Sequence, residues 1–486
     1  MTNRVVLVLV LSLFVVTSIN QHSMNVEITN DLAGITLQSA STETITEVKG
    51  FSSNVLLSTN DASYPHHVEV SMAISDNDTL FVGWKESNTH NGAGIRVSVT
   101  KSVNGGRTWT RPYSMPMFTS WTTGQSDPWL VWHDGIIYYA YLEYGITGSS
   151  LSQITVARSD NYGASWTPVT ASHGEFFADK EMMVISDNGT IYIIYDDTDD
   201  ATLIGNTTIR LTRSINEGAS FQEICKITEQ TPWKGLPYMA LSSENDPYVT
   251  WLYLEPVDLD WGNIELARSL DGGFTFQESQ FINQDGNYST SLPGKITLPV
   301  VRFDQNDRLY VLWADGFDGG LNSFDVYLRY SDDYGETWSD RIRVNPTVEG
   351  NQWNPEMAIG ADGRLHIVYY DEQEGHYRPY YRTLTFTGDE HDEPVFGTPI
   401  PVAHSLTSSS FTRPGEYMGI QLDSKGIPHI AWTDGRNGEM DVYYAHGINE
   451  AFSPVGPVIL LVGTSVILVA VIVLYVQKHQ RASVVN

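Results

Sequence analysis

The chain has 486 residues, a formal net charge of −30 and a single cysteine. This charge argues against nucleic acid as a partner, because phosphate groups are bound mainly by Lys and Arg. One cysteine excludes an intramolecular disulfide, and Cys225 has no neighbours at metal-ligand spacing, so we expect it to be a buried apolar residue. The 40 glycines and 12% aromatic residues are typical of many short strands joined by turns.

Residues 1–18 are predicted to be a secretory signal. Arg4 precedes an apolar run from Val5 to Val16, which is short for a helix that spans a membrane. An uncleaved N-terminal anchor is the alternative. Residues 19–52 are rich in Ser, Thr and Asn and are predicted to be a linker.

From residue 53 to residue 447 the chain repeats one unit, which has two apolar strands and then a third strand that ends in a polar phrase. The phrase is Ser-x-Asp/Asn-x-Gly-x-Ser/Thr-Trp/Phe, and we call it the octapeptide. Its five copies begin at Ser102, Ser159, Ser214, Ser269 and Ser331, so successive copies start 57, 55, 55 and 62 residues apart. A fixed period of this kind indicates one supersecondary unit used repeatedly.

Each part of the octapeptide has a structural use. The third residue can bond the backbone of its own turn, glycine at the fifth position permits positive φ, and the closing aromatic can pack beneath the turn. The octapeptide resembles the Asp-box (BNR repeat) of the sialidase-like β-propeller superfamily, over roughly residues 60–447. The resemblance implies an all-β propeller of four-stranded blades, and we expect a structural role for Asn104, Asn161, Asn216, Asp271 and Asp333.

Seven repeats can be counted, although the last two lack an octapeptide. Sialidases of the family that the chain resembles have six blades, so six remains the alternative. The seventh repeat has only three strands before the chain continues to its C-terminal segment. Asn54–Ser58 is placed to supply the fourth, which would close the ring with strands from both ends of the domain.

Because neighbouring strands of a blade are antiparallel, all octapeptides should lie on one face of the propeller. The loops between second and third strands, and those between blades, should lie on the other face and build a shared central pocket. An acid recurs at this face, which indicates either function or inheritance from an ancestral repeat. The predicted binding residues are His66, Glu69, Asp127, Asp179, Lys180, Asp196, Asp315, Glu356 and Asp434.

The resemblance to sialidases implies a clamp of three arginines, a tyrosine nucleophile paired with a glutamate, and an acid as proton donor. The family's early Arg-Ile-Pro phrase is absent, and the nearest match is Arg413-Pro-Gly-Glu416-Tyr417. Other glycosidases need two carboxylates, and Glu181 and Asp371 are candidates from opposite blades. The catalytic candidates are therefore Glu181, Asp371, Arg413, Arg436 and Tyr417.

The competing hypothesis is a binding module without catalysis, because the fold alone does not decide activity. We favour recognition of a glycan or a surface protein through the acidic loop face, and an exo-glycosidase of sialidase type is the alternative. No cofactor is required. Calcium is a candidate ligand of Asp315, Asp318 and Asp325, although these lack the spacing of an EF-hand.

The C-terminal part predicts a membrane anchor. Residues 448–454 form a short linker, and residues 455–476 are 22 residues without a charged side chain, enough to cross a bilayer. Lys478 and Arg481 lie in the tail of residues 477–486, and basic residues favour the cytoplasmic side. We therefore expect a single-pass protein of the cell membrane, with the propeller outside and the tail inside.

Overall fold

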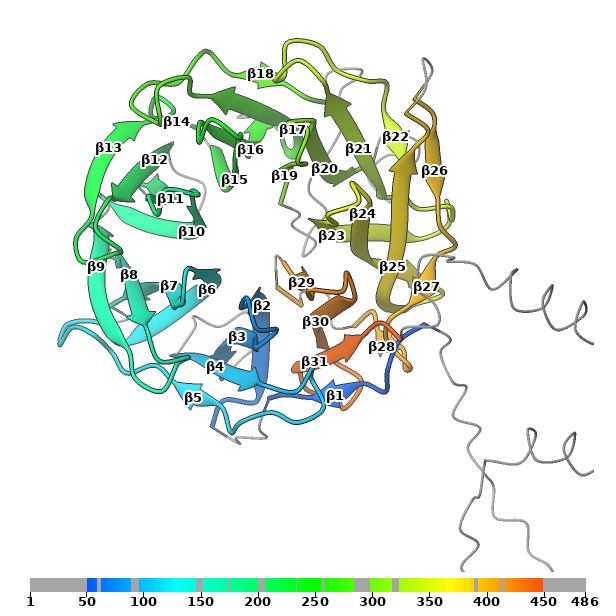
Figure 1. The fold of residues 1–486 in the computed structure, drawn as a ribbon, viewed down its shortest axis with the longest axis horizontal. Coiled ribbons are helices and arrows are strands. Elements are labelled where there is room, and N and C mark those ends of the chain that lie inside the picture. Colours follow the sequence, from blue (N-terminus) through cyan, green and yellow to red (C-terminus); the bar gives the residue numbers. More distant parts are fainter. Residues whose placement is uncertain are drawn as a thin grey trace, which may run out of the picture. The chain divides into compact units, whose positions relative to one another are not determined.

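The computed structural model describes residues 50–448, except 59–62, 89–95, 146–151, 174, 200–205, 233, 256–257, 284–297, 317–322, 389–391, 411–413 and 416. The described residues form seven β-sheets around a central axis (Figure 1). The expected β-propeller is thus confirmed with seven blades rather than six. The predicted signal 1–18, the linker up to residue 49, the anchor 455–476 and the tail 477–486 lie outside the described residues. Within the part that is described, no helix is both long and apolar enough to cross a membrane.

The first four blades follow one another along the chain. Blade one contains β2 (His66–Ile74), β3 (Leu80–Ser87), β4 (Arg96–Ser102) and β5 (Tyr113–Ser114). Blade two contains β6 (Gly124–His133), β7 (Ile136–Tyr144), β8 (Ser152–Ser159) and β9 (Thr167–His173). Blade three contains β10 (Phe177–Ile185), β11 (Ile191–Thr198), β12 (Asn206–Ser214) and β13 (Gln222–Lys226), with β14 (Thr231–Pro232) also paired to β12. Blade four contains β15 (Lys234–Leu241), β16 (Pro247–Glu255), β17 (Asp258–Arg268) and β18 (Gln280–Phe281).

The last three blades complete the circle. Blade five contains β19 (Val300–Phe303), β20 (Leu309–Asp315), β21 (Asp325–Ser331) and β22 (Ile342–Arg343). Blade six contains β23 (Asn351–Ile359), β24 (Leu365–Gln373), β25 (His376–Phe386) and β26 (Pro394–Phe396), and β25 also pairs with β27 (Ile400–Pro401) and β28 (Thr407–Ser408). Blade seven contains β29 (Gly419–Leu422), β30 (Pro428–Asp434), β31 (Asp441–His446) and, from the other end of the domain, β1 (Val55–Leu56).

The seam between the two ends of the domain lies in blade seven, as predicted. Val55 pairs with Tyr444 in an antiparallel register. The Ser58 hydroxyl donates to the Asp441 carboxylate at 2.9 Å, and Phe51 forms a bridge with Gly447. This pairing covers the edge of β31, which would otherwise present unpaired backbone groups.

The antiparallel order gives the ring two distinct faces. The turns between first and second strands share one face with the turns between third and fourth strands, and we call it the turn face. The connections between second and third strands, and those between blades, share the opposite face, which we call the loop face. All internal gaps in the description, except 389–391, fall in connections of the loop face.

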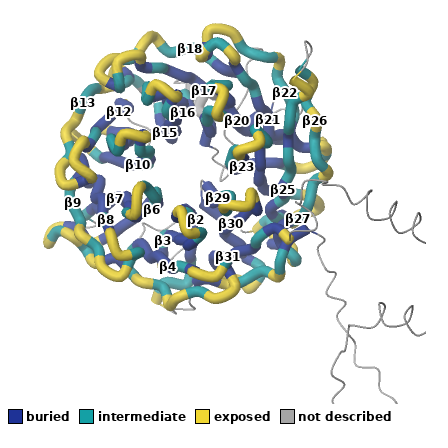
Figure 2. Tube along the Cα trace, in the orientation of Figure 1, coloured by how far each residue is buried: buried dark blue, intermediate teal, exposed yellow. Residues whose placement is uncertain are grey.

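The blades are held together by apolar side chains that alternate with the pleat of each strand. Figure 2 shows buried strands throughout the ring and exposed segments mainly at the turns. Five tryptophans are the largest side chains that are no more than 1% exposed, and the second strands contribute four of them: Trp84, Trp251, Trp313 and Trp432. Burying such indoles between adjacent sheets supplies much of the hydrophobic stabilisation of the ring.

The octapeptides form the self-bonded turns that their residues predict. In the first, the Ser102 hydroxyl donates to Asn104 at 3.0 Å and accepts from the Gly106 backbone N–H at 2.9 Å. Asn104 also accepts from the Thr108 N–H at 3.0 Å. The other four copies repeat this pattern, and the fifth-position glycine has φ between 74° and 90° in all five. The third-position residues therefore hold turns together.

Each octapeptide also contacts the preceding blade. The first one, in blade one, lies on blade seven, where the Tyr444 hydroxyl donates to the Gly105 carbonyl at 3.4 Å. The ring of Tyr444 meets Trp109 edge to face, with 4.8 Å between centroids. The third one accepts a hydrogen bond from Tyr138 of blade two at the Glu217 carbonyl, 3.4 Å away. The octapeptide thus connects neighbouring sheets as well as its own two strands.

Candidate functional site

The innermost strand of each blade lines the central channel, and five of these strands share one irregularity. The register shifts within β2, β6, β10, β15 and β23. Each shift contains a residue with positive φ: Glu69, Asp127, Lys180, Leu236 and Asn354. A bulge of this kind re-aims the following side chains. The residues two positions further on all line the channel: Ser71, Trp129, Met182, Tyr238 and Glu356.

These strands enclose a cavity of about 620 Å³. It extends along the innermost strands from the bulges to the turns between first and second strands, where Asp187, Ser243 and Asp307 line its mouth. In the described part of the chain, the pocket therefore opens on the turn face. This differs from the expectation that the loops of the opposite face build it.

A cluster of three polar side chains forms one wall of the pocket. The Tyr238 hydroxyl donates to the Glu356 carboxylate, whose two oxygens both lie 2.9 Å away, and it accepts a hydrogen bond from Arg302. Arg302 also binds the carboxylate directly, with 3.1 Å between Nη2 and Oε1. These residues come from blades four, five and six, so only the closed ring brings them together.

The cluster is largely removed from water. The Tyr238 side chain is fully buried, and those of Glu356 and Arg302 are 7% and 28% exposed. Burial raises the pKa of Tyr238 well above its usual value, and the nearby Glu356 adds to the rise while Arg302 opposes it. Burial also raises the pKa of Glu356, against the opposing charge of Arg302. The phenol therefore stays protonated and gains nucleophilic character only if Glu356 accepts its proton.

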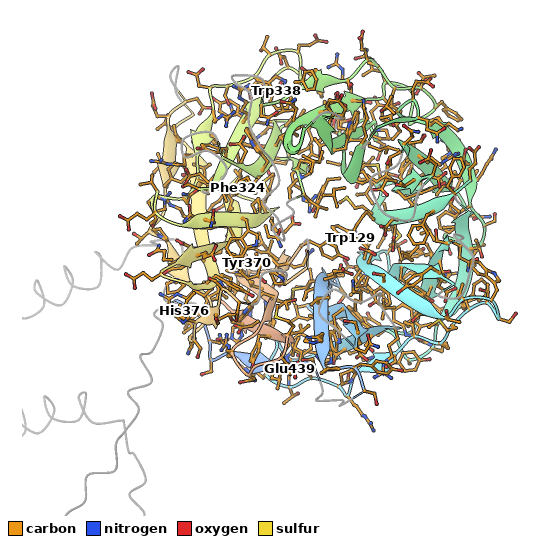
Figure 3. The ribbon with its side chains drawn as sticks, turned by 180° about the vertical axis from the view of Figure 1, so that it is seen from behind. Trp129, Phe324, Trp338, Tyr370, His376 and Glu439 are labelled. Carbon is orange, nitrogen blue, oxygen red and sulfur yellow. The ribbon has the colours of Figure 1, made fainter. Side chains whose placement is uncertain are left out.

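Aromatic rings adjoin the polar cluster. The Trp129 ring meets Tyr238 and Tyr417 edge to face, with centroids 5.7 Å and 5.6 Å away. Figure 3 shows Trp129 at the edge of the central channel. Sugars present both an apolar face of C–H groups and a rim of hydroxyls, so a wall that combines rings with charged hydrogen-bonding groups suits them.

The recurring acids at the ends of the second strands have partners inside the blades. Trp84, Trp313 and Trp432 each donate the indole N–H to an acid two positions further on, at 3.2, 2.7 and 3.1 Å. These acids are Glu86, Asp315 and Asp434. Basic side chains complete their surroundings: Arg96 pairs with Glu86, Arg341 with Asp315 and Arg436 with Asp434. We conclude that this recurrence has a structural cause, because the carboxylates are buried and bonded.

The remaining residues predicted for the binding face lie mostly beside the bulges and are also buried. Lys180 pairs with Asp127, and Lys85 with Glu69, both at 2.5 Å. His66 lies 3.5 Å from the exposed Glu439. The acids predicted for the binding face are buried and do not form an exposed surface: Glu69, Asp127, Asp179, Asp196, Asp315, Glu356 and Asp434. Of these acids, Glu356 lines the pocket.

Three buried acids of blade three have raised pKa values, so their ionisation is unfavourable. Burial, together with the negative charge of Asp127, raises the pKa of Asp179 to about 7. The pKa of Glu181 is raised well above its usual value by burial and by Asp127, and no described residue forms a hydrogen bond with either of its carboxylate oxygens. The pKa of Asp196 is raised by burial and then by Asp179, although the Leu236 N–H donates to it at 3.2 Å.

The four catalytic candidates in the described part of the chain come from blades three, six and seven and have separate partners. Asp371 accepts hydrogen bonds from Gln352 and Gln373, and nothing in the described residues joins it to Glu181. Arg436 contacts Asp434 and Asn54 in blade seven. Arg413 lies outside the described residues. Tyr417 alone lines the pocket, where its hydroxyl donates to the Pro128 carbonyl at 3.3 Å.

Two of the three calcium candidates already have protein partners. Arg341 lies 2.9 Å from one oxygen of Asp315, and Asn345 donates to Asp325 at 2.5 Å. Asp318 lies outside the described residues. Among the residues that the structure places, no group of three or more His, Cys, Asp or Glu side chains is arranged to hold a metal ion.

Tyr238, Arg302 and Trp129 were not among the residues predicted from the sequence. A signal for two of them exists, because proline precedes the channel-lining residue in Asp127-Pro-Trp129, Leu236-Pro-Tyr238 and Asn354-Pro-Glu356. Proline in a strand marks a bulge or an edge, and its recurrence on the first strand of the repeat identifies the re-aimed position. In blade five the same pattern occurs as Leu298-Pro299-Val300, but it marks Val300 and not Arg302, which lies two residues further along β19.

Comparison with known proteins shows the fold but no family. No protein-family model matches the chain, and no curated protein sequence matches it. Among solved structures, an ulvan lyase of polysaccharide lyase family PL25 with bound -[GlcA(1-4)Rha3S]- is 10% identical, covers 82% of this chain and 94% of its own, and has a TM-score of 0.52.

Two glycoside hydrolase structures are similar at lower scores. The α-L-arabinofuranosidase Arb93A from Fusarium graminearum is 13% identical over 82% of this chain and 98% of its own, with a TM-score of 0.49. The Hadza microbial sialidase Hz136 is 15% identical over 63% of this chain and 64% of its own, with a TM-score of 0.47. At 10% identity the ulvan lyase structure shows the shared fold alone.

Proposed function

We propose that this protein is an extracellular Asp-box propeller of the sialidase-like superfamily, anchored in the cell membrane, that binds a glycan in its central pocket. The observation that carries the proposal is the buried cluster of Tyr238, Arg302 and Glu356 beside the rings of Trp129 and Tyr417. A cavity of about 620 Å³ is within the usual range for small-ligand sites. The ulvan lyase, which has a bound saccharide, has the same fold.

The ligand is expected to be a neutral or weakly charged sugar. Of the arginines in the described part of the chain, Arg302 alone lines the pocket. A clamp of three arginines, which the resemblance to sialidases implies for a sialic acid carboxylate, is therefore not assembled among the described residues, which do not include Arg413. Arg210 and Arg436 are instead engaged with acids of their own blades. The proposal needs no cofactor, and it does not depend on calcium.

Binding by the full chain in detergent tests the proposal, with a glycan array followed by titration of the best ligand. Arg302→Ala should weaken binding about tenfold or more, because a charged donor is lost from a desolvated wall. Arg158→Ala is the matched control, because Arg158 pairs with the exposed Glu217 at 3.4 Å, away from the pocket. Equal loss of affinity in both variants, or no ligand for a folded protein, would contradict the proposal.

An exo-glycosidase is the second candidate function, and one observation favours it. The Tyr238 hydroxyl lies 2.9 Å from Glu356, within the distance at which a carboxylate can accept the proton of an attacking phenol. Tyr238 would then be the nucleophile, Glu356 the base, and Arg302 would stabilise the phenolate through its hydrogen bond. The low intrinsic acidity of Tyr238 makes this pairing a requirement for the reaction.

Hydrolysis of a fluorogenic panel of exo-glycosides separates the two functions. If the protein is an enzyme, Tyr238→Phe should abolish turnover and Glu356→Gln should lower kcat by about 10²-fold or more. Under the binding proposal, no glycoside is turned over by the folded protein while glycan binding persists. Turnover that survives Tyr238→Phe would refute the assignment of the nucleophile.

A further inference from the structure

The turn face carries exposed apolar side chains at one repeated position. The second residue of the octapeptide is Val103, Ile215 or Leu270 in blades one, three and four, and these side chains are 73%, 76% and 59% exposed. Phe274 and Tyr334, at other positions of the octapeptide, are 53% and 41% exposed. Single exposed apolar residues are ordinary on protein surfaces. Within the fold, Arg213 lies over the Phe274 ring and the Tyr334 hydroxyl donates to Asp307 at 3.1 Å. The recurrence of Val103, Ile215 and Leu270 at the tip of the same turn, in three of the five octapeptides, calls for a partner on this face.

The described chain ends on the same face. β31 runs from the loop face to the turn face, and Ile448 follows it with its N–H bonded to the Gly50 carbonyl at 2.8 Å. Near this end, Tyr444 contacts the tip of the first octapeptide at Gly105. Residues 449–454 then lead to the uncharged segment 455–476. Six residues span at most about 22 Å when fully extended, so the turn face cannot lie far from the bilayer that holds this segment.

We infer that the turn face docks on the surface of the lipid bilayer, with the octapeptide tips in the headgroup region and the central pocket opening toward the membrane. This inference rests on the proposed membrane anchor. The pocket mouth, lined by Asp187, Ser243 and Asp307, lies on the docked face. It follows that the pocket takes sugars held at the surface of the same membrane.

The charge of the turn face specifies the kind of lipid. The turns between first and second strands carry the exposed carboxylates of Asp76, Asp134, Asp187 and Glu244. Anionic lipids would be repelled by these groups, whereas a zwitterionic surface lets the apolar tips insert without that repulsion. The docking surface is therefore matched to phosphatidylcholine-like headgroups.

Fluorescence quenching in reconstituted vesicles tests this inference. The full chain, with Cys225→Ser, is placed in phosphatidylcholine vesicles that contain lipids with a nitroxide on the headgroup. One environment-sensitive fluorophore is attached at Ile215→Cys on the turn face. The matched control is Val348→Cys, since Val348 is 52% exposed and its carbonyl accepts a hydrogen bond from Ser323 of the loop face.

The expected result is strong quenching at position 215 and almost none at position 348. Replacing Val103 and Leu270 by Asp should reduce the quenching at position 215, and adding anionic lipid should reduce it too. Equal quenching at both positions, or stronger quenching at position 348, would overturn the inference. The inference would also be overturned if the fluorophore at position 215 is not quenched by the lipid but becomes protected from solvent when the protein self-associates. In that case the partner of the turn face would be a second copy of the chain.

The outcome is separable from the proposed glycan binding. If the quenching pattern fails while the full chain in detergent still binds its glycan, the docking surface is wrong and the proposed function stands. If the pattern appears but no glycan binds in detergent, the docking surface stands and the proposed function fails.

Discussion

Two adjacent glycines at the ring seam give a sharp test of how the octapeptide stabilises the propeller. Gly105 and Gly106 have φ of 70° and 81°, so alanine is strained at either position. A Cβ at Gly105 would meet nothing within 4 Å. A Cβ at Gly106 would lie 2.1 Å from the Tyr444 hydroxyl oxygen and 2.2 Å from its ring. The two variants therefore differ in one contact, which joins blade one to blade seven.

The expected magnitudes follow from this contact. The left-handed conformation costs alanine about 1 kcal/mol at either position. At Gly106 the Tyr444 ring must also move, although it is fully buried and its hydroxyl lies 2.6 Å from His429 Nδ1. Such overpacking costs about 1–3 kcal/mol more. For a domain of about 400 residues, the summed cost of Gly106→Ala corresponds to a fall in Tm of about 2–5 °C, against about 1 °C for Gly105→Ala.

Thermal and urea unfolding, followed by tryptophan fluorescence, measure the difference. Trp109 contacts Tyr444, so its emission reports on the seam itself. Tyr444→Phe in the Gly106→Ala background should recover part of the loss, because the hydroxyl oxygen makes the shortest contact with the new methyl group. Equal destabilisation by Gly105→Ala and Gly106→Ala would refute the reasoning, since it would mean that the contact between blades contributes nothing.

Three further predictions concern pH, the octapeptide and metal ions. Because the pKa of Asp179 is raised to about 7 in the folded state, its ionisation opposes folding, and stability should fall as pH rises from about 4 to above 7. Asp179→Asn should make the urea midpoint at pH 8 higher and its dependence on pH weaker, whereas Asp160→Asn, at an exposed turn, should change neither. Ser331→Ala removes hydrogen bonds to Gly335 and Asp333 and should cost about 1–2 kcal/mol in urea unfolding, while Ser410→Ala at an exposed position should cost almost nothing. Chelation with EDTA should leave Tm unchanged within about 1 °C, and a larger fall would show that a bound cation stabilises the protein.

The fold could be predicted from the sequence because its defining contacts are local. Ser102, Asn104 and Gly106 bond one another within a stretch of five residues, so the octapeptide indicates its own turn without any knowledge of the rest of the chain. The number of blades could be predicted in the same way, by counting the repeats. The pairing at the seam could also be predicted, since a last repeat with three strands requires a fourth strand from elsewhere.

The site could not be predicted in the same way, because it is made of residues from three different repeats. Tyr238 and Glu356 are 118 positions apart, and Arg302 is 64 positions from Tyr238. Which of these side chains come into contact depends on the diameter of the ring and on the direction in which each bulge turns the side chains that follow it. Of the predicted binding acids, Glu356 lines the pocket, whereas Asp315 and Asp434 are buried and accept hydrogen bonds from the indoles of Trp313 and Trp432. Polarity at the end of a strand therefore does not distinguish an acid that lines the channel from one that is bonded inside its own blade.

The pairing of Val55 with Tyr444 has a consequence for biosynthesis. The two partners are separated by nearly the whole domain, so the N-terminal strand has no sheet to join until translation is almost complete. A nascent chain that stops before β31 has six blades able to form, but the ring stays open at both ends. The open ring exposes the apolar faces of its two terminal blades, which can pack against other chains. These faces are covered only when the last strands before residue 448 close the ring.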